Sequence, residues 1–164
     1  MPPLAYISLG SNLGDSRQML LEAMARLQPF SDEPIQHSSL WQTTPVDCPP
    51  GSPPFVNAVA GLRPRQGESP ETLLQKLRAL EVEFGRQPKL ILNEPRILDL
   101  DLICFGAETR QTEALILPHP RAHLRKFVLQ PLSEIAPDLI LPGHSRTVRQ
   151  LLAVLPDSEI IAKL

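Results

Sequence analysis

The spacing of hydrophobic positions changes along the chain, and these changes predict where strands and helices lie. Short apolar or alternating runs predict strands at residues 4–9, 35–43, 55–62, 97–105, 115–117 and 159–162. Apolar residues three and four positions apart predict helices at about 16–28, 69–85, 127–135 and 147–153. Helices thus separate most of the strands over the first two thirds of the chain.

The order of these elements indicates the fold class. A strand, a helix, two strands, a helix and a strand predict an α+β fold with a ferredoxin-like βαββαβ core, in which helices cover a mostly antiparallel sheet. No repeat, low-complexity tract or linker divides the 164 residues, so we expect a single domain over 1–164.

The composition excludes several classes of protein. Nineteen prolines interrupt the chain too often for a helical bundle or coiled coil. A net charge of −2 provides no overall field for nucleic acid or an anionic membrane. We therefore expect neither as a partner.

The location of the protein is predicted from its cysteines and its apolar runs. The two cysteines, Cys48 and Cys104, lack metal-ligand spacing, which favours a reducing compartment. The sequence shows neither a signal peptide nor an apolar run long enough to cross a membrane. We expect a cytoplasmic protein.

Candidate chemistry begins at Asp99-Leu100-Asp101. Residues two apart on a strand point to the same side, so the two carboxylates lie together while Leu98, Leu100 and Leu102 face the core. Adjacent like charges are neutralised by a divalent cation such as Mg²⁺, or they lie on a solvated face beside arginines. For an isolated pair of this kind, the solvated face is the more common case.

Basic residues flank this strand. Arg86 and Arg96 border a loop before it, and a second basic cluster that includes His119 and Arg125 lies in 118–127. Such cations suit a polyphosphate and its metal, and they equally suit plain surface loops. The common nucleotide-binding motifs, including the P-loop and the G-x-G-x-x-G fingerprint, are absent.

Several segments together resemble a known family. They are Tyr6-Ile7-Ser8-Leu9-Gly10-Ser11-Asn12-Leu13-Gly14-Asp15, Phe55-Val56-Asn57-Ala58, Pro95-Arg96-Ile97-Leu98-Asp99-Leu100-Asp101, Leu117-Pro118-His119-Pro120-Arg121 and the stretch from Phe127 to Pro137. In order and spacing they resemble 6-hydroxymethyl-7,8-dihydropterin pyrophosphokinase of folate biosynthesis, over nearly the whole chain. The resemblance implies transfer of pyrophosphate from ATP to the pterin hydroxymethyl group, which gives the pterin diphosphate and AMP.

The resemblance also implies roles for individual residues. It assigns two Mg²⁺ ions to Asp99 and Asp101, and so favours the metal over the solvated face. For the pterin it implies recognition by Asn57, stacking on Phe55 and Phe127, and backbone contacts from the loop that holds Thr43 and Val46. For ATP and its phosphates it implies contacts from Leu74, Glu81, Arg86, Arg96, Leu102, Leu115, His119 and Arg125, with catalytic roles for Arg86 and Arg96.

The chain departs from the family pattern at Pro88, Asn93-Glu94 and Pro120. Two alternatives to the enzyme therefore stay open. One is a catalytically silent relative that binds pterin or nucleotide, and the other is a Mg²⁺-dependent phosphotransferase with a different acceptor. In each case we expect small-molecule substrates and a monomer.

Overall fold

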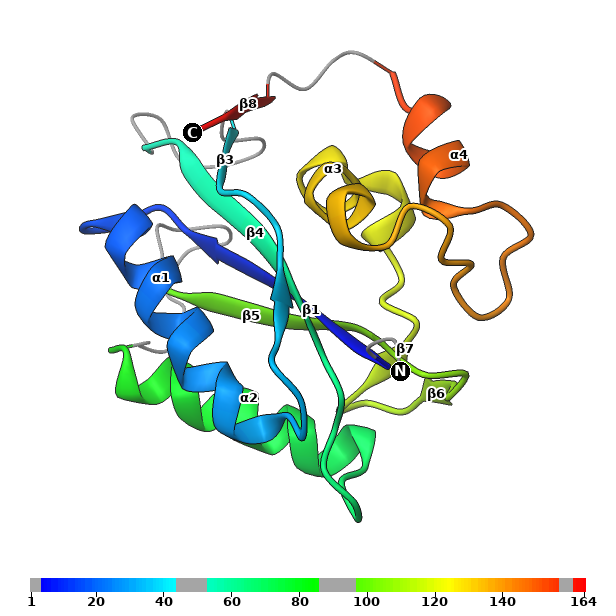
Figure 1. Cartoon of the computed structure of the whole chain (residues 1–164), viewed down its shortest axis with the longest axis horizontal. Coiled ribbons are helices and arrows are strands. Elements are labelled where there is room, and N and C mark those ends of the chain that lie inside the picture. The colour runs from blue at the N-terminus through cyan, green and yellow to red at the C-terminus, as the bar shows by residue number, and fades with distance from the viewer. Residues whose placement is uncertain (1–3, 44–52, 86–96, 157–160) are drawn as a thin grey trace.

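A computed structural model of the chain describes residues 4–43, 53–85, 97–156 and 161–164 (Figure 1). Its elements are, in order, β1 (Ala5–Ser11), α1 (Ser16–Leu27), η1 (Gln28–Phe30), β2 (Gln36–His37), β3 (Trp41–Thr43), β4 (Phe55–Leu62), α2 (Pro70–Glu83), β5 (Asp99–Phe105), β6 (Arg110–Gln111), β7 (Ile116–Leu117), η2 (Ala122–Leu124), α3 (Lys126–Ile135), α4 (Val148–Ala153) and β8 (Ile161–Lys163).

The central sheet has six strands. Its main path runs β5-β1-β4-β3-β8, β2 also pairs with β4, and all these pairs are antiparallel. The order places β1 and β4 in the middle, as the ferredoxin-like prediction requires, and β6 and β7 form a separate two-stranded ribbon. The predicted fold class is confirmed.

Each face of the sheet is covered by helices (Figure 1). Alternate residues of β1 and β5, among them Ile7, Leu9 and Leu100, pack with the buried stripes of α1 and α2 in one apolar cluster. Tyr6 and Ile103 belong to a second cluster on the other face, together with buried residues of α3 and α4. The polar strand positions described below lie on the α3 side.

Local capping explains where the helices begin. Asp15 accepts a hydrogen bond from the backbone N–H of Gln18 at 3.2 Å, which satisfies one free donor in the first turn of α1. Ser69 and Thr72 form a reciprocal capping box at the start of α2, where Pro70 needs no N–H partner. These caps lie at the starts of the helices predicted at about 16–28 and 69–85.

The predicted strand at 35–43 is wrong as one element, because it divides into β2 and β3. His37 faces Ala60 and Trp41 faces Asn57, so the intervening segment has one residue more than the facing part of β4. At this point the Ser38 hydroxyl accepts the backbone N–H of Val59 at 2.9 Å, a donor that a strand carbonyl would otherwise take. The other predicted elements are present with ends shifted by one or two residues, and the part of the last strand at 159–160 lies outside the described residues. The prediction missed β6 and the two 3₁₀ helices.

Candidate active site

The acid pair lies where the strand alternation of β5 predicts it. Leu98, Leu100 and Leu102 are buried in the cluster with α1 and α2, so Asp99 and Asp101 project from the opposite face. Both acids are only half-buried. Burial and the neighbouring negative charge of Asp99 raise the pKa of Asp101 to about 6, because both disfavour the ionised carboxylate.

Two carboxylates on one strand suit a magnesium site. In the described parts of the chain, no group of three or more His, Cys, Asp or Glu side chains could hold a metal ion. A metal ion at this site would therefore have at most the two carboxylates as protein ligands among the described residues. Mg²⁺ in proteins is commonly held by one or two carboxylates and takes its remaining ligands from water and substrate phosphates. The donor set therefore fits this metal.

A row of residues across the sheet connects the acid pair to an amide. In register, Asp99 faces Gly10 of β1, and Gly10 faces Asn57 of β4. Paired residues point to the same face, and two strand spacings separate Asp99 from Asn57 by about 10 Å. A Cβ on Gly10 would lie 3.0 Å from Nδ2 of Asn57, so only glycine leaves this part of the surface clear.

The amide of Asn57 is held in a fixed orientation. Asn57 is buried, and the Thr43 hydroxyl donates to its Oδ1 at 2.9 Å. The nitrogen of the amide then lies toward Gly10. Thr43 thus contributes a side-chain contact that orients Asn57, whereas the family resemblance implies only backbone contacts from its loop.

Phe55 comes from the sheet and Phe127 from helix α3, which covers the same face of the sheet. Phe55 is two residues before Asn57 on β4, so it lies on the same face, and its ring is 3.9 Å from the position of a Gly10 Cβ. Phe127 lies at the start of α3 and is half-buried against the second apolar cluster, with the Arg125 guanidinium carbon 5.4 Å from its ring centre. Both rings therefore have partly exposed surface on the α3 side of the molecule.

His119 and Arg125 lie near the acids. Burial and the positive charges of Arg125 and Arg121 lower the pKa of His119 to about 4, against the opposing effect of Asp99. The imidazole is therefore neutral at physiological pH. Its Nδ1 accepts the backbone N–H of Arg121 at 3.1 Å, which assigns the proton to Nε2 as a hydrogen-bond donor.

Glu81 is fully buried between α2 and β5. Its Oε2 accepts the backbone N–H of Leu100 at 2.8 Å, and its Oε1 accepts Nη1 of Arg78 at 2.7 Å. The same Nη1 donates to the carbonyl oxygen of Leu100 at 2.7 Å, and Nη2 lies 3.9 Å from Asp101. Glu81 and Arg78 together hold the peptide groups of the residue between the two acids.

The remaining predicted residues divide into two groups. Leu102 and Leu115 are buried in the apolar cluster beneath α1 and α2, and Leu74 is partly buried against it, so one cluster contains all three. Val46, Arg86 and Arg96 lie outside the described residues.

Gly10 and Arg78 are site residues that the sequence prediction missed. Arg78 stands three positions before Glu81 on a helix, and this spacing was the available signal. The role of Gly10 follows only from strand register.

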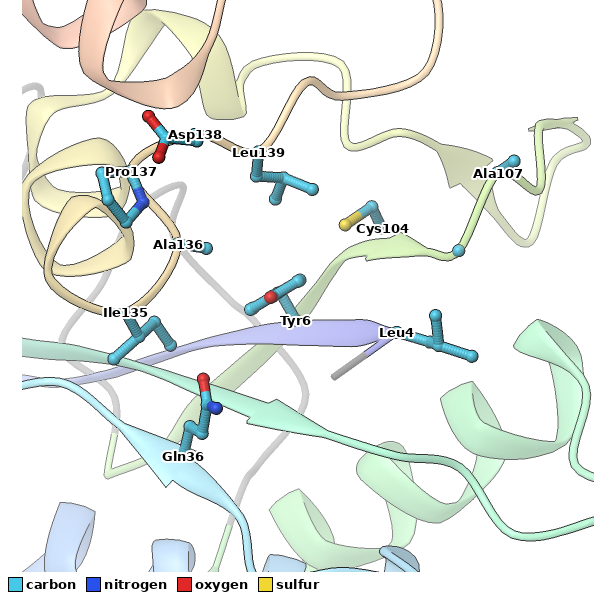
Figure 2. A pocket seen from close by; sticks show the side chains of 11 residues that line it. Leu4, Tyr6, Gln36, Cys104, Ala107, Ile135, Ala136, Pro137, Asp138 and Leu139 are labelled. Atoms are coloured by element: carbon cyan, nitrogen blue, oxygen red, sulfur yellow. The ribbon is translucent and has the colours of Figure 1, made fainter. Parts of the chain in front are cut away.

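A separate cavity of about 590 Å³ lies at the other end of β1 and β5 (Figure 2). Tyr6, Cys104 and residues that follow α3 line it. Burial raises the pKa of the Cys104 thiol to about 12, so the thiol is protonated and unreactive. The row from Asp99 to Asn57 does not reach this cavity.

The chain is similar to a family of known proteins. Residues 6–137 match the family model described as 7,8-dihydro-6-hydroxymethylpterin-pyrophosphokinase (HPPK). A 2-amino-4-hydroxy-6-hydroxymethyldihydropteridine pyrophosphokinase of Haemophilus influenzae is 38% identical over 158 residues, which are 96% of each chain. One from Synechocystis is 38% identical over 90% of this chain and 74% of its own length.

Longer proteins also match. The folic acid synthesis protein fol1 of Pneumocystis carinii is 36% identical over 94% of this chain, which spans only a fifth of that protein. The crystal structure of wild-type Plasmodium falciparum HPPK-DHPS with pteroate superposes with a TM-score of 0.69 at 14% identity, over 93% of this chain and 42% of that one. At that identity the superposition supports the fold alone. Within the described ranges, no helix is long and apolar enough to cross a membrane.

Proposed function

The chain belongs to the 7,8-dihydro-6-hydroxymethylpterin-pyrophosphokinase family, and from this we propose that it transfers pyrophosphate from ATP to the hydroxymethyl group of 6-hydroxymethyl-7,8-dihydropterin on the α3 face of its sheet. The hydroxymethyl oxygen attacks the β-phosphorus of ATP, a new O–P bond forms, and the bond to the α-phosphate oxygen breaks to release AMP. The row Asp99–Gly10–Asn57 is the observation that supports this proposal, because a carboxylate that suits a cation and an amide that suits a ring edge lie about 10 Å apart on one surface.

The pterin end is assigned to Asn57 and its neighbours. Hydrogen bonding by Thr43 fixes the amide, so its nitrogen donates to a ring-edge acceptor without first reorganising. Phe55 and Phe127 offer aromatic surface from the sheet and from α3, which suits stacking on a flat heterocycle. Val46 completes this set by the resemblance alone.

The phosphate end is assigned to Asp99 and Asp101, with two Mg²⁺ ions. When bound, Mg²⁺ neutralises phosphate charge and polarises the transferring group. Arg125 lies close enough to His119 to lower the pKa of the imidazole. On the α3 side, Arg125 supplies a positive charge and the Nε2–H of His119 supplies a hydrogen-bond donor. Arg86 and Arg96 are proposed to close over the triphosphate from the loop before β5. Leu74, Leu102 and Leu115 are assigned to adenine by the resemblance alone, because they pack in the cluster beneath α1 and α2 and not on the α3 face.

We assign Glu81 a positioning role. Its carboxylate binds the Leu100 N–H between the two acids, so it fixes the backbone from which both metal ligands project. This extends the sequence-based prediction, which placed Glu81 only near the nucleotide.

AMP formation from ATP, hydroxymethyldihydropterin and Mg²⁺ tests the proposal. We expect AMP only when all three are present, no AMP from Asp99→Asn or Asp101→Asn, and normal AMP from the exposed-acid control Glu113→Gln. Titration of the pterin in a calorimeter, with a non-hydrolysable ATP analogue present, separates the alternatives. Folded protein that binds pterin but forms no AMP would be a silent relative, and AMP without pterin binding would indicate another acceptor.

Family membership does not determine the number of domains, the oligomeric state or the location of this protein. We propose a single domain, a monomer and a cytoplasmic location. Light scattering during gel filtration tests the monomer, and a mass of twice 18.2 kDa would contradict it.

A further inference from the structure

Two histidines that the proposed reaction does not use lie together beside α3. His123 belongs to η2, and His144 belongs to the connection between α3 and α4. Their ring centres are 4.9 Å apart and the ring planes are tilted by 57°. The two residues are 21 positions apart in the sequence, so the fold and not local spacing brings them together.

His123 has an unusual nitrogen. Its Nδ1 is the one buried side-chain nitrogen or oxygen, over the described ranges, that lacks a hydrogen-bond partner. A buried polar atom without a partner is unfavourable, and in native proteins such an atom calls for a ligand, water or ion. The ring of His144 lies beside it, with the two ring centres 4.9 Å apart.

The ring separation fits a shared metal ion. A transition-metal ion bonded to an imidazole nitrogen at ~2.1 Å lies ~3.2 Å from that ring's centre. Two imidazoles on one ion, with a nitrogen–metal–nitrogen angle of about 100°, then have centres about 5 Å apart, as a near-tetrahedral site requires. The observed 4.9 Å equals this separation, which is also within the range of ordinary contacts between rings.

We propose that His123 and His144 form a binding site for a borderline transition-metal cation of the Zn²⁺, Ni²⁺ or Co²⁺ class. Neutral imidazole is a preferred ligand for these ions, whereas Mg²⁺ prefers oxygen, so this site is chemically distinct from the acid pair. Two histidines leave the other coordination positions to water. Arg121 and Arg125 each stand two residues from His123 in the sequence, and positive charges oppose a cation, so we expect weaker binding than at a four-ligand structural zinc site.

The site has a structural consequence. Arg125 is the residue at which η2 ends and α3 begins, and α4 also contacts η2. A cation shared by His123 and His144 therefore fastens the segment that carries Arg125 to the connection before α4. Binding should raise the thermal stability of the protein, since only the folded chain brings the two rings together.

Titration with Co²⁺ or Zn²⁺ in excess Mg²⁺ tests the proposal, because Mg²⁺ occupies the carboxylate oxygens. We expect one equivalent to bind to the wild-type protein and to raise its Tm. Both effects should be lost in His123→Gln and in His144→Gln, and both should persist in His37→Gln, a histidine on β2 that lies away from the pair.

A second measurement does not depend on the variants folding. In wild-type protein, imidazole nitrogen resonances of His123 and His144 should shift together on addition of Zn²⁺, with Nδ1 of His123 as the bonded atom. The proposal is overturned if these resonances do not move, or if the double variant binds the same number of ions as the wild type. Either result would leave the pair as a packing contact. Neither readout depends on pyrophosphate transfer, so failure here is distinguishable from failure of the proposed function.

Discussion

Replacement of Glu81 tests how the acid pair is held in place. Glu81 is fully buried, and Leu100 N–H depends on its Oε2 for a hydrogen bond of 2.8 Å. Glu81→Met keeps the length of the side chain but provides no good acceptor. Glu81→Gln keeps one oxygen that can accept the Leu100 N–H, and it replaces the charged oxygen that accepts Arg78 with an NH2 group. The pair of variants therefore separates the hydrogen bond from the ion pair with Arg78.

The expected sizes follow from these contacts. A buried N–H left without an acceptor costs ~1–3 kcal/mol. Arg78 is about half exposed, so loss of its charge partner adds at most ~1 kcal/mol. Burial of the apolar methionine offsets part of this loss. We expect Glu81→Met to lose ~1–3 kcal/mol of unfolding free energy and Glu81→Gln ~1 kcal/mol or less.

Urea and thermal unfolding, followed by circular dichroism, measure both variants. At this chain length ~1–3 kcal/mol lowers Tm by roughly 3–10 °C. Glu83→Gln is the matched control on the same helix, because Glu83 is exposed and pairs with Arg26 on the surface, where a change within ~0.5 kcal/mol is normal. A Glu81→Met protein as stable as the wild type would refute the positioning role, and so would a Gln variant as unstable as the Met variant.

Three further changes probe the site and the sheet around it. In the metal-free protein the pKa of Asp101 is raised to about 6, so it binds its proton more tightly when folded, and stability should fall as pH rises from about 4 to 6. Asp101→Asn should abolish AMP formation and flatten that part of a urea-unfolding profile against pH, and a profile unchanged from wild type would contradict the assignment. Gly10→Ala should raise KM for the pterin at least tenfold, measured by initial rates, because its Cβ crowds the amide of Asn57 at 3.0 Å; an unchanged KM would remove Gly10 from the site. Burial alone would raise the pKa of Glu134, but its hydrogen bonds lower it. Glu134→Gln should therefore lose ~1 kcal/mol at pH 7 and show no difference from wild type well below pH ~4, and a difference that persists in acid would refute this.

Most helices and strands could be predicted from the sequence because their positions depend on local signals. The α2 helix begins at Ser69 and Pro70, where the cap and the fixed proline dihedral are both written in the sequence. The split of the 35–43 strand was not readable, because it depends on the Ser38 hydroxyl taking the N–H of Val59, a residue 21 positions away. Serine has no intrinsic signal for such a contact in a strand.

The sequence predicts the local part of the candidate site but not how its separate segments come together. Asp99 and Asp101 share a face by the period of a strand alone, and the structure confirms that placement. Their relation to Asn57 is non-local, because it depends on β1 pairing with both β4 and β5 through Gly10. Glu81 illustrates the same limit, since a helix position fixes its face but not which backbone N–H it reaches.

The irregularity in β5 shows why the acid pair keeps its alternation. Between Tyr6 and Ile7 the register with β5 slips, so that Tyr6 faces Cys104 while Ile7 faces Leu102. Ile103 and Cys104 consequently both pack in the α3-side cluster, against the simple alternation predicted for 97–105. The register change lies after Asp101 in β5. Only the later residues of β5, which face the Tyr6 end of β1, therefore depart from the alternation. A bulge before Leu100 would instead have turned one acid into the apolar layer, where no cation could reach it.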